Sequence, residues 1–331
     1  MKKPLVKIAQ VGAGYWGKNL VRNFSQLGVL AAIVEPDDEL GAKLEKEFGV
    51  PKRSLSEVLN DPSIIGVSIA TPAETHFKIA HEAFSRGKHV FVEKPVSLNI
   101  DETECLLRLA ERKKLTLMVG HLLQYHPVFQ RLLKLTTENF IGDIKHIYSS
   151  RLSFGKLRSQ ENVWWSFAPH DLSMILSLTG SDPVSLTAQG SCHIGRTIED
   201  WVTAQMQFSN GVSAHLNISW LHPFKEHRLV VTGDSGSLVF EDSALDWEKK
   251  LCFYPSTVNI GENGNPVLIK GEPVNIMVPF SEPLRNECQH FLDCIKSGKR
   301  PLTDGEEGLG VLRVLRAVDQ HILTQKNVLS R

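Results

Sequence analysis

The sequence has no excess of charge of either sign, because 37 basic residues balance 37 acidic ones and leave a formal net charge of zero at pH 7. Without a basic block, the chain is not expected to bind nucleic acid or an anionic membrane. It also lacks any apolar run of the roughly 18 residues that a membrane span requires. Met-Lys-Lys leads at once into an expected strand, with no secretory apolar region. We therefore predict a cytoplasmic protein whose partners are small molecules.

Cysteine is scarce as well, with five residues in a chain of 331. The number is odd, the positions are scattered, and no Cys-x-x-Cys pair occurs, so neither a disulfide framework nor a zinc site has support. No His-Glu-x-x-His or similar spacing points to a metal, and we expect none. A chain of this length exceeds one typical domain and favours two.

The N-terminus, in contrast, is rich in glycine. An apolar strand is expected over residues 6–11, and it ends in Gly12-Ala-Gly14-Tyr-Trp-Gly17, after which a helical pattern runs to about Leu27. Gly12 permits the tight turn, Gly14 lets the backbone approach a pyrophosphate, and Gly17 lets the helix pack closely on the strand. The free N–H groups at the start of the helix attract phosphate. This strand–loop–helix context predicts dinucleotide binding.

An acidic residue follows at the distance that the dinucleotide motif requires. A second strand is expected over residues 29–34, and Glu35 comes directly after it, eighteen residues beyond Gly17. An acid at this place can accept hydrogen bonds from the adenosine ribose. Asp37 and Asp38 lie beside it and would repel a 2′-phosphate, so NAD is favoured over NADP. The alternative is a solvated acidic turn.

Strands and helices alternate through the first third of the chain. After the second strand, helices are expected over 39–48, 54–59, 75–86 and 101–113, and strands over 66–70, 89–92 and 115–120. This alternation is typical of a parallel sheet with helices on both faces. We predict an α/β fold in which residues 1–121 form a Rossmann dinucleotide-binding domain.

The pattern changes near residue 121. Long strands are expected over 144–154, 184–193, 201–208, 212–220, 228–232 and 237–241, with Asn210-Gly211 as a hairpin turn between two of them. Helices are expected over 127–135, 170–178, 284–297 and 305–323, and a loop over 261–266. Residues 122–331 are therefore predicted to form an α+β domain with a large, mainly antiparallel open sheet, for substrate binding and oligomerisation. Its C-terminal helices can pack back on the first domain.

Two polar residues lie at positions where catalytic residues are expected. Lys94 follows a buried strand and precedes a proline, so it should lie at the carboxyl edge of the sheet, where it could exchange a proton with a substrate hydroxyl. His170, expected at the start of a helix, could hydrogen-bond the reacting hydroxyl. The alternatives are a surface lysine beside a turn and a structural histidine. Asp171 could serve only the helix dipole.

Several of these motifs together resemble those of the Gfo/Idh/MocA oxidoreductases. The matching segments are 11–17, 70–72 with His76, 87–95, 119–121, 141–144, the His170 helix, and 283–305 in part. The resemblance covers nearly the whole chain, and Glu93-Lys94-Pro95 is its most specific motif. It implies a nicotinamide cofactor, Lys94 as catalytic lysine, His170 as substrate-site histidine, and homodimers or homotetramers built on the open sheet of the second domain.

The residues expected at the site follow from the motifs and the resemblance together. Those expected to bind the cofactor are Gly12, Gly14, Tyr15, Trp16, Gly17, Glu35, Ala70, Thr71, Pro72, His76, Glu93 and Lys94. Those expected to bind substrate are Lys94, Gln124, Tyr125, Arg151, Arg158, Trp165, Ser166 and His170. Many family members carry Asp-x-x-x-His where this chain has Ser166 and His170, and serine cannot act as a carboxylate partner of the histidine.

The expected function is NAD-dependent oxidation of a secondary hydroxyl of a sugar. The Gly-Tyr-Trp-Gly-Lys-Asn loop is similar to that of a subgroup that oxidises nucleotide sugars at C3 in surface-polysaccharide sugar synthesis. Arg151, Lys156 and Arg158 could meet a diphosphate or a uronate, although a solvated strand and loop face is the simpler explanation. Two alternatives stay open: a free sugar or polyol dehydrogenase, such as inositol 2-dehydrogenase, and a non-catalytic nucleotide-sensing protein.

Overall fold

The computed structural model describes residues 6–155, 157–158, 161–195 and 197–329, so that Lys156 lies outside the described residues. The chain divides into two compact units, Met1–Tyr125 with Glu282–Leu312, and His126–Ser281 with Arg313–Arg331. Segment 282–312 thus belongs to the first unit, although it lies far along the chain. The domain boundary at residue 121 stays a prediction. Among the described residues, no helix has the length and apolar character of a membrane span.

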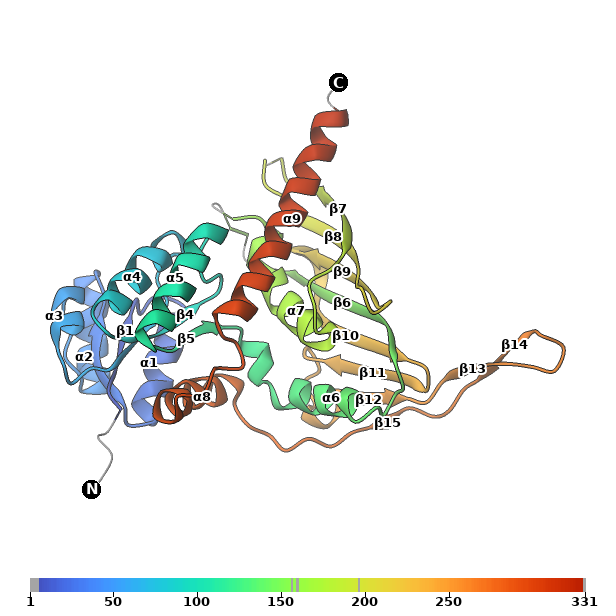
Figure 1. Ribbon diagram of the computed structural model, residues 1–331, viewed down its shortest axis with the longest axis horizontal. Coiled ribbons are helices and arrows are strands. Elements are labelled where there is room, and N and C mark those ends of the chain that lie inside the picture. The colour runs from blue at the N-terminus through green and yellow to red at the C-terminus, as the bar shows by residue number, and fades with distance from the viewer. Residues whose placement is uncertain (1–5, 156, 159–160, 196, 330–331) are drawn as a thin grey trace. The chain divides into compact units, whose positions relative to one another are not determined.

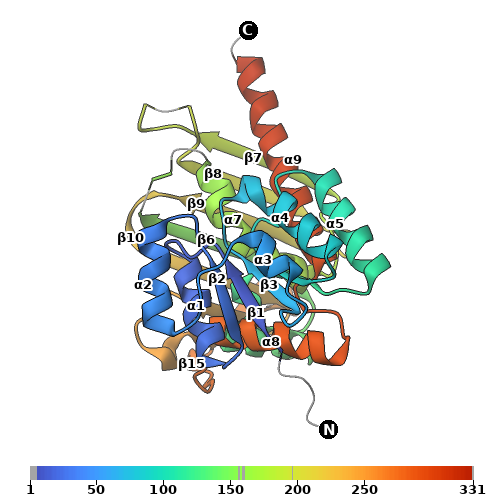
Figure 2. The ribbon, with the colours of Figure 1, turned by 90° about the vertical axis from the view of Figure 1, so that its left-hand side faces the viewer.

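The first unit is built on a parallel sheet of five strands (Figures 1 and 2). The strands are β1 (Ile8–Val11), β2 (Leu30–Val34), β3 (Gly66–Ile69), β4 (His89–Glu93) and β5 (Leu117–Gly120), in the order β2-β1-β3-β4-β5. The helices are α1 (Gly17–Gln26), α2 (Asp38–Phe48), α3 (Leu55–Asn60), α4 (Ala73–Ser85), α5 (Ile100–Lys113) and α8 (Pro283–Ser297), and η1 (Leu122–Tyr125) is a short 3₁₀ helix. The prediction of a Rossmann-type sheet is confirmed.

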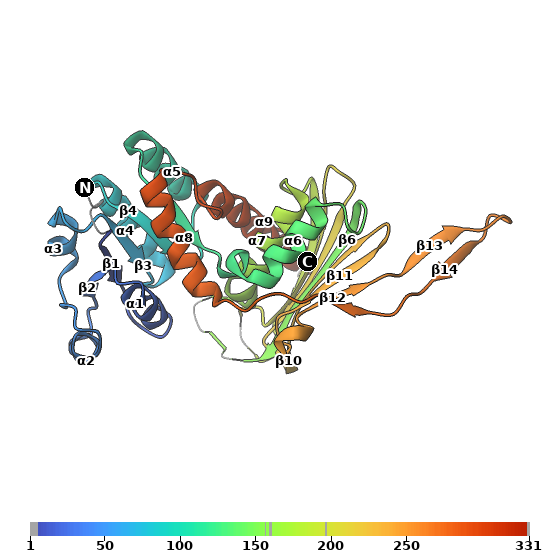
Figure 3. The same cartoon turned by 90° about the horizontal axis from the view of Figure 1, so that it is seen from below.

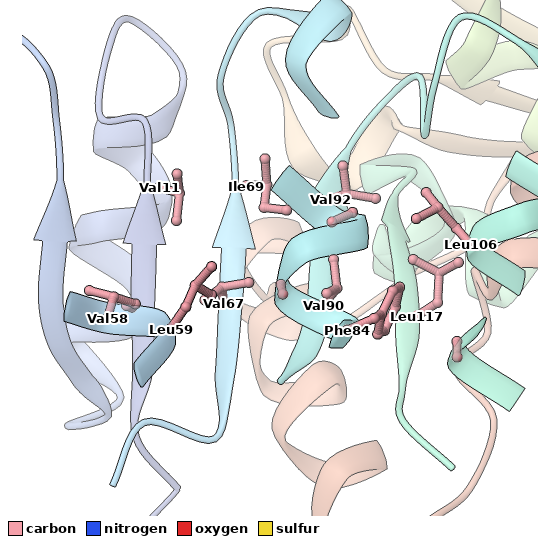
Figure 4. Packing of buried hydrophobic residues seen from close by; sticks show 14 of the residues in the cluster. Val11, Val58, Leu59, Val67, Ile69, Phe84, Val90, Val92, Leu106 and Leu117 are labelled. Carbon is pink, nitrogen blue, oxygen red and sulfur yellow. The ribbon is translucent and has the colours of Figure 1, made fainter. Parts of the chain in front are cut away.

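Apolar side chains cover both faces of this sheet. On one face, Val67 and Val90 pack with Leu59 from α3, Phe84 from α4 and Leu106 from α5 (Figure 4). On the other face, helices α1 and α8 pack in a second cluster that includes their phenylalanines and one from β4. Burial on both faces explains why the strands are short apolar runs without alternation.

The second unit is built on a sheet of eight strands in the order β15-β12-β11-β10-β6-β9-β8-β7. They are β6 (Ile144–Phe154), β7 (Ser185–Ser191), β8 (Trp201–Gln207), β9 (Ser213–Ser219), β10 (Leu221–Gly233), β11 (Gly236–Glu241), β12 (Leu251–Tyr254) and β15 (Val274–Asn275). Among the described strands of this sheet, only β6 and β9 pair in parallel, so the prediction of a mainly antiparallel sheet is confirmed. Asn210-Gly211 forms the turn of the β8–β9 hairpin, with Gly211 at φ 84°.

One face of this sheet carries helices. Figure 3 shows α6 (Pro127–Thr137) and α7 (Val163–Thr179) along it, and the later part of α9 (Gly305–Leu329) also belongs to this unit. Buried residues alternate with less buried ones along β8, and Thr187 and Gln189 on β7 are exposed. This alternation is typical of an antiparallel sheet with one covered and one open face.

Two predictions about the second unit were wrong in their starting residues. Helix α7 begins at Val163 and not at His170, because the side chain of Asn162 caps it by accepting the N–H of Trp165 at 3.1 Å. Pro169 lies inside the helix and does not start it. Strand β10 begins at Leu221 and not at Arg228.

No pattern in the sequence predicted a hairpin around the loop expected over residues 261–266. Strands β13 (Thr257–Ile260) and β14 (Pro266–Ile269) pair as a separate two-stranded sheet, and the 3₁₀ helix η2 (Trp247–Lys249) precedes β12. The hairpin extends away from β12 and β15 (Figure 3). The predicted loop over 261–266 is the tip of this hairpin, apart from its last residue.

Candidate dinucleotide and catalytic site

The three glycines of the first loop have three different surroundings. Gly12 has φ +80°, and a Cβ there would lie 2.8 Å from the carbonyl oxygen of Ala70. A Cβ at Gly17 would collide with the carbonyl oxygen of Gly12. A Cβ at Gly14 would meet nothing within 4 Å. Gly12 and Gly17 are thus required by the backbone itself, whereas Gly14 leaves open space where a pyrophosphate would approach.

Glu35 connects the end of β2 to the glycine loop. Its Oε2 accepts the backbone N–H of Ala13 at 2.7 Å, and its Oε1 accepts the N–H of Asp37 at 3.1 Å. The residue is 9% exposed. Each carboxylate oxygen has a second lone pair, so Glu35 can hold the loop and still accept a ribose hydroxyl. The neighbouring Asp37 caps α2 by accepting the N–H of Leu40.

The site lies where the strand order changes direction. Strand β1 has β2 on one side and β3 on the other, and ligands of open α/β sheets bind outside the carboxyl ends of strands at such a point. The N–H of Ala70 donates to the carbonyl of Val11 at 2.8 Å, so the loop after β3 adjoins the glycine loop. The structure brings Ala70, Thr71 and Pro72 to this edge.

His76 joins two of the loops at this edge. The buried imidazole on α4 lies between two carbonyl oxygens, with Nε2 2.8 Å from that of Thr71 and Nδ1 2.8 Å from that of Pro95. Burial lowers its pKa although both carbonyls favour the protonated ring. His76 therefore fixes the loop after β3 to the loop that carries Lys94, and the peptide bond between Lys94 and Pro95 is cis.

Glu93 lies between the glycine loop and Lys94. The indole Nε1 of Trp16 donates to its Oε1, and the backbone N–H of Lys94 lies 3.3 Å from its Oε2. A Cβ on Gly120, its partner on β5, would be 3.0 Å from the carboxyl carbon, so the glycine makes room for this side chain. Burial raises the pKa of Glu93 to about 7, although Trp16 and Lys94 act in the opposite direction.

Gln124 and Tyr125 are both buried within the first unit. The hydroxyl of Tyr125 lies 2.9 Å from Oγ1 of Thr303, and the ring belongs to the apolar cluster around α1 and α8. Burial raises the pKa of Tyr125 well above its usual value. This placement makes Tyr125 part of the packing behind β5. Substrate contact by either residue stays a prediction.

In the second unit, Arg151 and Asp171 form a buried ion pair. Nε of Arg151 on β6 lies 2.5 Å from Oδ2 of Asp171 on α7, and the residues are 6% and 1% exposed. Ser149 donates to Oδ1 of the same carboxylate at 2.7 Å, and Nη1 of Arg151 lies 3.1 Å from Nδ1 of His227. The sequence offered only a helix-dipole role for Asp171. In the sequence, only the position of Asp171 next to His170 could have indicated a further role for this residue.

The remaining predicted substrate residues differ in exposure. Ser166 is buried one turn before His170 on α7, and His170 is partly buried. Trp165 donates its indole N–H to Asp319 on α9, and the Arg316 guanidinium lies 5.7 Å from the ring centre. Arg158 is exposed and pairs with Glu161 at 2.9 Å. Nε1 of the fully buried Trp164 donates to the carbonyl of Leu315 at 3.2 Å.

Comparison with known families gives the identity of both units. A model described as an oxidoreductase family with an NAD-binding Rossmann fold, GFO_IDH_MocA, matches residues 6–121. The GFO/IDH/MocA C-terminal domain model matches residues 129–239. The chain belongs to the Gfo/Idh/MocA oxidoreductase family. The resemblance inferred from the motifs is confirmed, and with it a nicotinamide-dependent oxidoreductase.

Individual relatives span more than nine-tenths of the chain. The UDP-N-acetylglucosamine 3-dehydrogenase of Acidithiobacillus ferrooxidans is 27% identical over an alignment of 312 residues that covers 91% of this chain and 92% of the relative. A solved structure of that enzyme covers 96% of this chain and 97% of its own, with a TM-score of 0.82 and 25% identity. A protein of Magnetospirillum magnetotacticum MS-1 gives the same TM-score at 31% identity and covers 95% of this chain and 99% of its own.

A further relative represents a different substrate class. The inositol 2-dehydrogenase of Rhizobium meliloti is 22% identical over an alignment of 338 residues that covers 98% of this chain and 98% of the relative. Relatives within the Gfo/Idh/MocA family therefore include a nucleotide-sugar dehydrogenase and a polyol dehydrogenase, both of full length.

Proposed function

We propose that this protein is an NAD-dependent dehydrogenase that oxidises a secondary hydroxyl of a nucleotide sugar at C3. The observation that supports it best is the arrangement at the carboxyl edge of the parallel sheet. There, Glu35 holds the glycine loop by the Ala13 N–H, and Glu93 joins Trp16 of that loop to the backbone of Lys94. The cofactor-holding loop and the loop of the proposed base are thus linked directly.

NAD, when bound, supplies the hydride acceptor. Gly12, Gly14 and Gly17 would admit the pyrophosphate, and Glu35 would accept hydrogen bonds from the adenosine ribose. Because an ionised carboxylate at this place repels a 2′-phosphate, we favour NAD over NADP. His76 keeps the loops after β3 and β4 at a fixed separation through its two carbonyl contacts.

Lys94 acts as the general base in the oxidation. Its amine takes the hydroxyl proton as the hydride leaves the carbon, and the same ammonium returns the proton in the reverse reaction. His170 orients the hydroxyl by a hydrogen bond. The carboxylate nearest in sequence, Asp171, is committed to Arg151 and Ser149. Ser166 is no carboxylate, so most of the acid–base work falls to Lys94.

The nucleotide-sugar substrate is supported by the relative from Acidithiobacillus ferrooxidans, which spans nearly the same length. Arg158 is an exposed cation in the segment expected to face a diphosphate. A polyol dehydrogenase is the second candidate, supported by the full-length relative from Rhizobium meliloti. We also propose that the open face of the second sheet builds a homodimer or homotetramer, which light scattering would measure.

The test is the formation of NADH, followed by absorbance, with UDP-N-acetylglucosamine, its uronate, and myo-inositol as substrates. We expect turnover with a uridine nucleotide sugar, and transfer of deuterium from a C3-deuterated sugar to the cofactor. Lys94→Met should lower kcat by at least about 100-fold, as expected for loss of a general base, while NADH binding persists. The control is Lys43→Met on the exposed surface of α2.

The other outcomes distinguish the alternatives. Turnover with myo-inositol but not with any uridine nucleotide sugar would establish the polyol dehydrogenase instead. Binding of NAD without turnover of any sugar or polyol, in wild type and Lys94→Met alike, would favour the nucleotide-sensing protein. Deuterium retained in the product from a C3-deuterated sugar that is turned over would exclude oxidation at C3.

A further inference from the structure

The helix that carries His170 has a proline directly before this residue. Pro169 lies inside α7, and the helix nevertheless continues to Thr179. Because proline has no backbone N–H, the carbonyl of Trp165 receives no helical hydrogen bond from position 169, and the proline ring crowds that carbonyl. Contacts from outside the helix are therefore expected to hold the turn around Pro169 and His170 in place.

The second unit provides such contacts on both sides of the proline. After it, Asp171 accepts hydrogen bonds from Nε of Arg151 at 2.5 Å and from the hydroxyl of Ser149 at 2.7 Å, both on β6. Before it, the ring of Phe167 meets the imidazole of His227 on β10 edge to face, with ring centres 6.4 Å apart. Since Phe167 and Asp171 are four residues apart, they lie one turn apart on the same side of α7.

His227 takes part in the contacts on both sides. It is the cross-strand neighbour of Arg151, whose Nη1 lies 3.1 Å from its Nδ1. A guanidinium can only donate hydrogen bonds, so Nδ1 is the acceptor and the neutral imidazole carries its proton on Nε2. Burial, which lowers the pKa of His227, agrees with this form. Oδ2 of Asp242 lies 3.8 Å from the same nitrogen, too far for a hydrogen bond.

The other ring nitrogen shows that histidine is not the most stable choice at this position. Nε2 of His227 is buried and has no hydrogen-bond partner among the residues that the structure describes. A buried N–H group without a partner costs free energy. What the imidazole supplies in return is an acceptor for Arg151 and a ring for Phe167 in one side chain, so that one residue supports α7 on both sides of Pro169.

We propose that His227 is a positioning residue that braces α7 on both sides of Pro169 and thereby fixes the direction of His170. This inference rests on the proposed function, in which His170 orients the reacting hydroxyl. In that oxidation the O–H bond breaks, its proton goes to Nζ of Lys94, and the hydride goes to the nicotinamide. His227 takes part in neither transfer and acts only through the position of His170.

Two substitutions separate the hydrogen bond of His227 from its bulk. In His227→Asn, the side-chain oxygen takes the place of Nδ1 and can still accept from Arg151. His227→Leu keeps an apolar side chain against Phe167, offers no acceptor, and leaves no buried N–H without a partner. The control is His321→Leu, the same change on α9, where the imidazole contacts Gln325 of the same helix at 2.8 Å.

The first measurement needs neither cofactor nor substrate. It is the rate of amide hydrogen exchange in peptides that cover α7, followed by mass spectrometry. We expect His227→Leu to speed exchange around residues 167–173 about tenfold, because the brace no longer opposes local opening of the helix. Exchange in β8 should not change. His227→Asn and His321→Leu should match wild type, and wild-type exchange rates in His227→Leu would overturn the proposal.

The second measurement is a double-mutant cycle with His170, using the substrate that wild type oxidises. His227→Leu should lower kcat/KM about tenfold, since misplacement of an orienting group slows the reaction, while the Kd for NADH stays unchanged. In the His170→Ala background, the same change should have no further effect, because no imidazole is left to position. His227→Asn should restore most of the activity. Equal losses in both backgrounds would make the role of His227 structural and overturn the proposal.

The two measurements also distinguish this inference from the proposed function. Absence of turnover in wild type would contradict the proposed function, while the exchange rates would still decide whether His227 braces α7. Faster exchange in His227→Leu at full activity would overturn the effect on His170. If His227→Leu does not fold, His227→Gln serves in both measurements, because its amide lies near the place of Nε2 and not at that of Nδ1.

Discussion

Glu35 is a single residue that holds the glycine loop and that, in the proposed function, also selects the cofactor. Its two oxygens hold the N–H groups of Ala13 and Asp37 at 2.7 and 3.1 Å. The sequence predicted the acid at this place from its distance to Gly17, but only the structure shows that the carboxylate also fixes the glycine loop. Loss of its charge should therefore affect both affinity and selectivity.

We expect Glu35→Gln to raise the Kd for NAD about tenfold, since a hydrogen bond to a charged group contributes roughly 1.5–3 kcal/mol. The Kd for NADP should fall, because the neutral amide no longer repels the 2′-phosphate. Fluorescence titration with NADH and NADPH measures both. Glu39→Gln, an exposed acid on α2, is the control. An unchanged ratio of the two affinities would contradict this role of Glu35.

The buried ion pair between Arg151 and Asp171 joins β6 to α7. Removing one partner leaves the other charge buried, so Arg151→Met should lower the free energy of unfolding by about 3–5 kcal/mol. The double variant Arg151→Met with Asp171→Leu should recover most of the loss. Urea unfolding is the measurement, and an effect of Arg151→Met below about 1 kcal/mol, typical of a surface pair, would refute the interpretation.

The prediction of Arg151 as a substrate residue shows what sequence alone cannot supply. A strand with Arg at one position does not reveal which face the side chain takes, and here β6 turns it inward to a carboxylate 20 residues away on α7. The conformation of Gly12 was predictable because it depends on local backbone context. Asp171, His121 and Glu287 were not, because their surroundings arise from elements far apart in the chain.

At the scale of elements, amphipathic and apolar periodicity located the helices and strands of the first unit, with small differences at their ends. Periodicity did not predict the elements correctly where local sequence signals conflict with the packing of the folded chain. Pro169 is typical of a helix start, yet α7 runs through it because Asn162 caps the helix seven residues earlier. The β13–β14 hairpin has no buried face, since all but one of its eight strand residues are exposed, so no alternation marks it.

That hairpin should contribute little to the stability of the second unit. Strand residues such as Ile260 and Leu268 are 72% and 69% exposed, and a lone two-stranded hairpin is at best marginally stable. The N–H of Gly271 donates to the carbonyl of Pro255 at 3.1 Å, so the ends of the hairpin are close together. Replacing residues 257–269 by a short glycine-containing turn should change the free energy of unfolding by less than about 0.5 kcal/mol.

Thermal unfolding of the shortened protein checks this, with the oligomeric state measured in parallel by light scattering. A large fall in Tm together with a smaller oligomer would mean that the exposed apolar side chains of the hairpin are buried against another chain. A large fall in Tm at unchanged oligomeric state would mean that the hairpin stabilises its own unit.

At the scale of the whole molecule, two sets of buried groups make stability depend on pH in opposite directions. Burial lowers the pKa of His76 and His227, and that of His126 to about 4. Their stabilisation is complete above the unfolded value of 6.5 and is lost as pH falls through their folded values. Burial raises the pKa of Glu93 and Glu287. Their contribution is complete below the unfolded value of 4.5 and is lost as pH rises through their folded values.

These signs predict that the Tm is highest near neutral pH and that Glu287 accounts for part of its fall on the alkaline side. Between pH 4.5 and its folded pKa, folded Glu287 keeps a proton that the unfolded chain releases, which costs about 1.4 kcal/mol per pH unit. Glu287→Gln has no such proton, so its Tm should rise relative to wild type as pH increases from about 5 to about 8. Glu282→Gln, at a partly exposed carboxylate that is paired with Arg22, is the control. A constant difference for Glu287→Gln would mean that Glu287 is ionised in the folded protein.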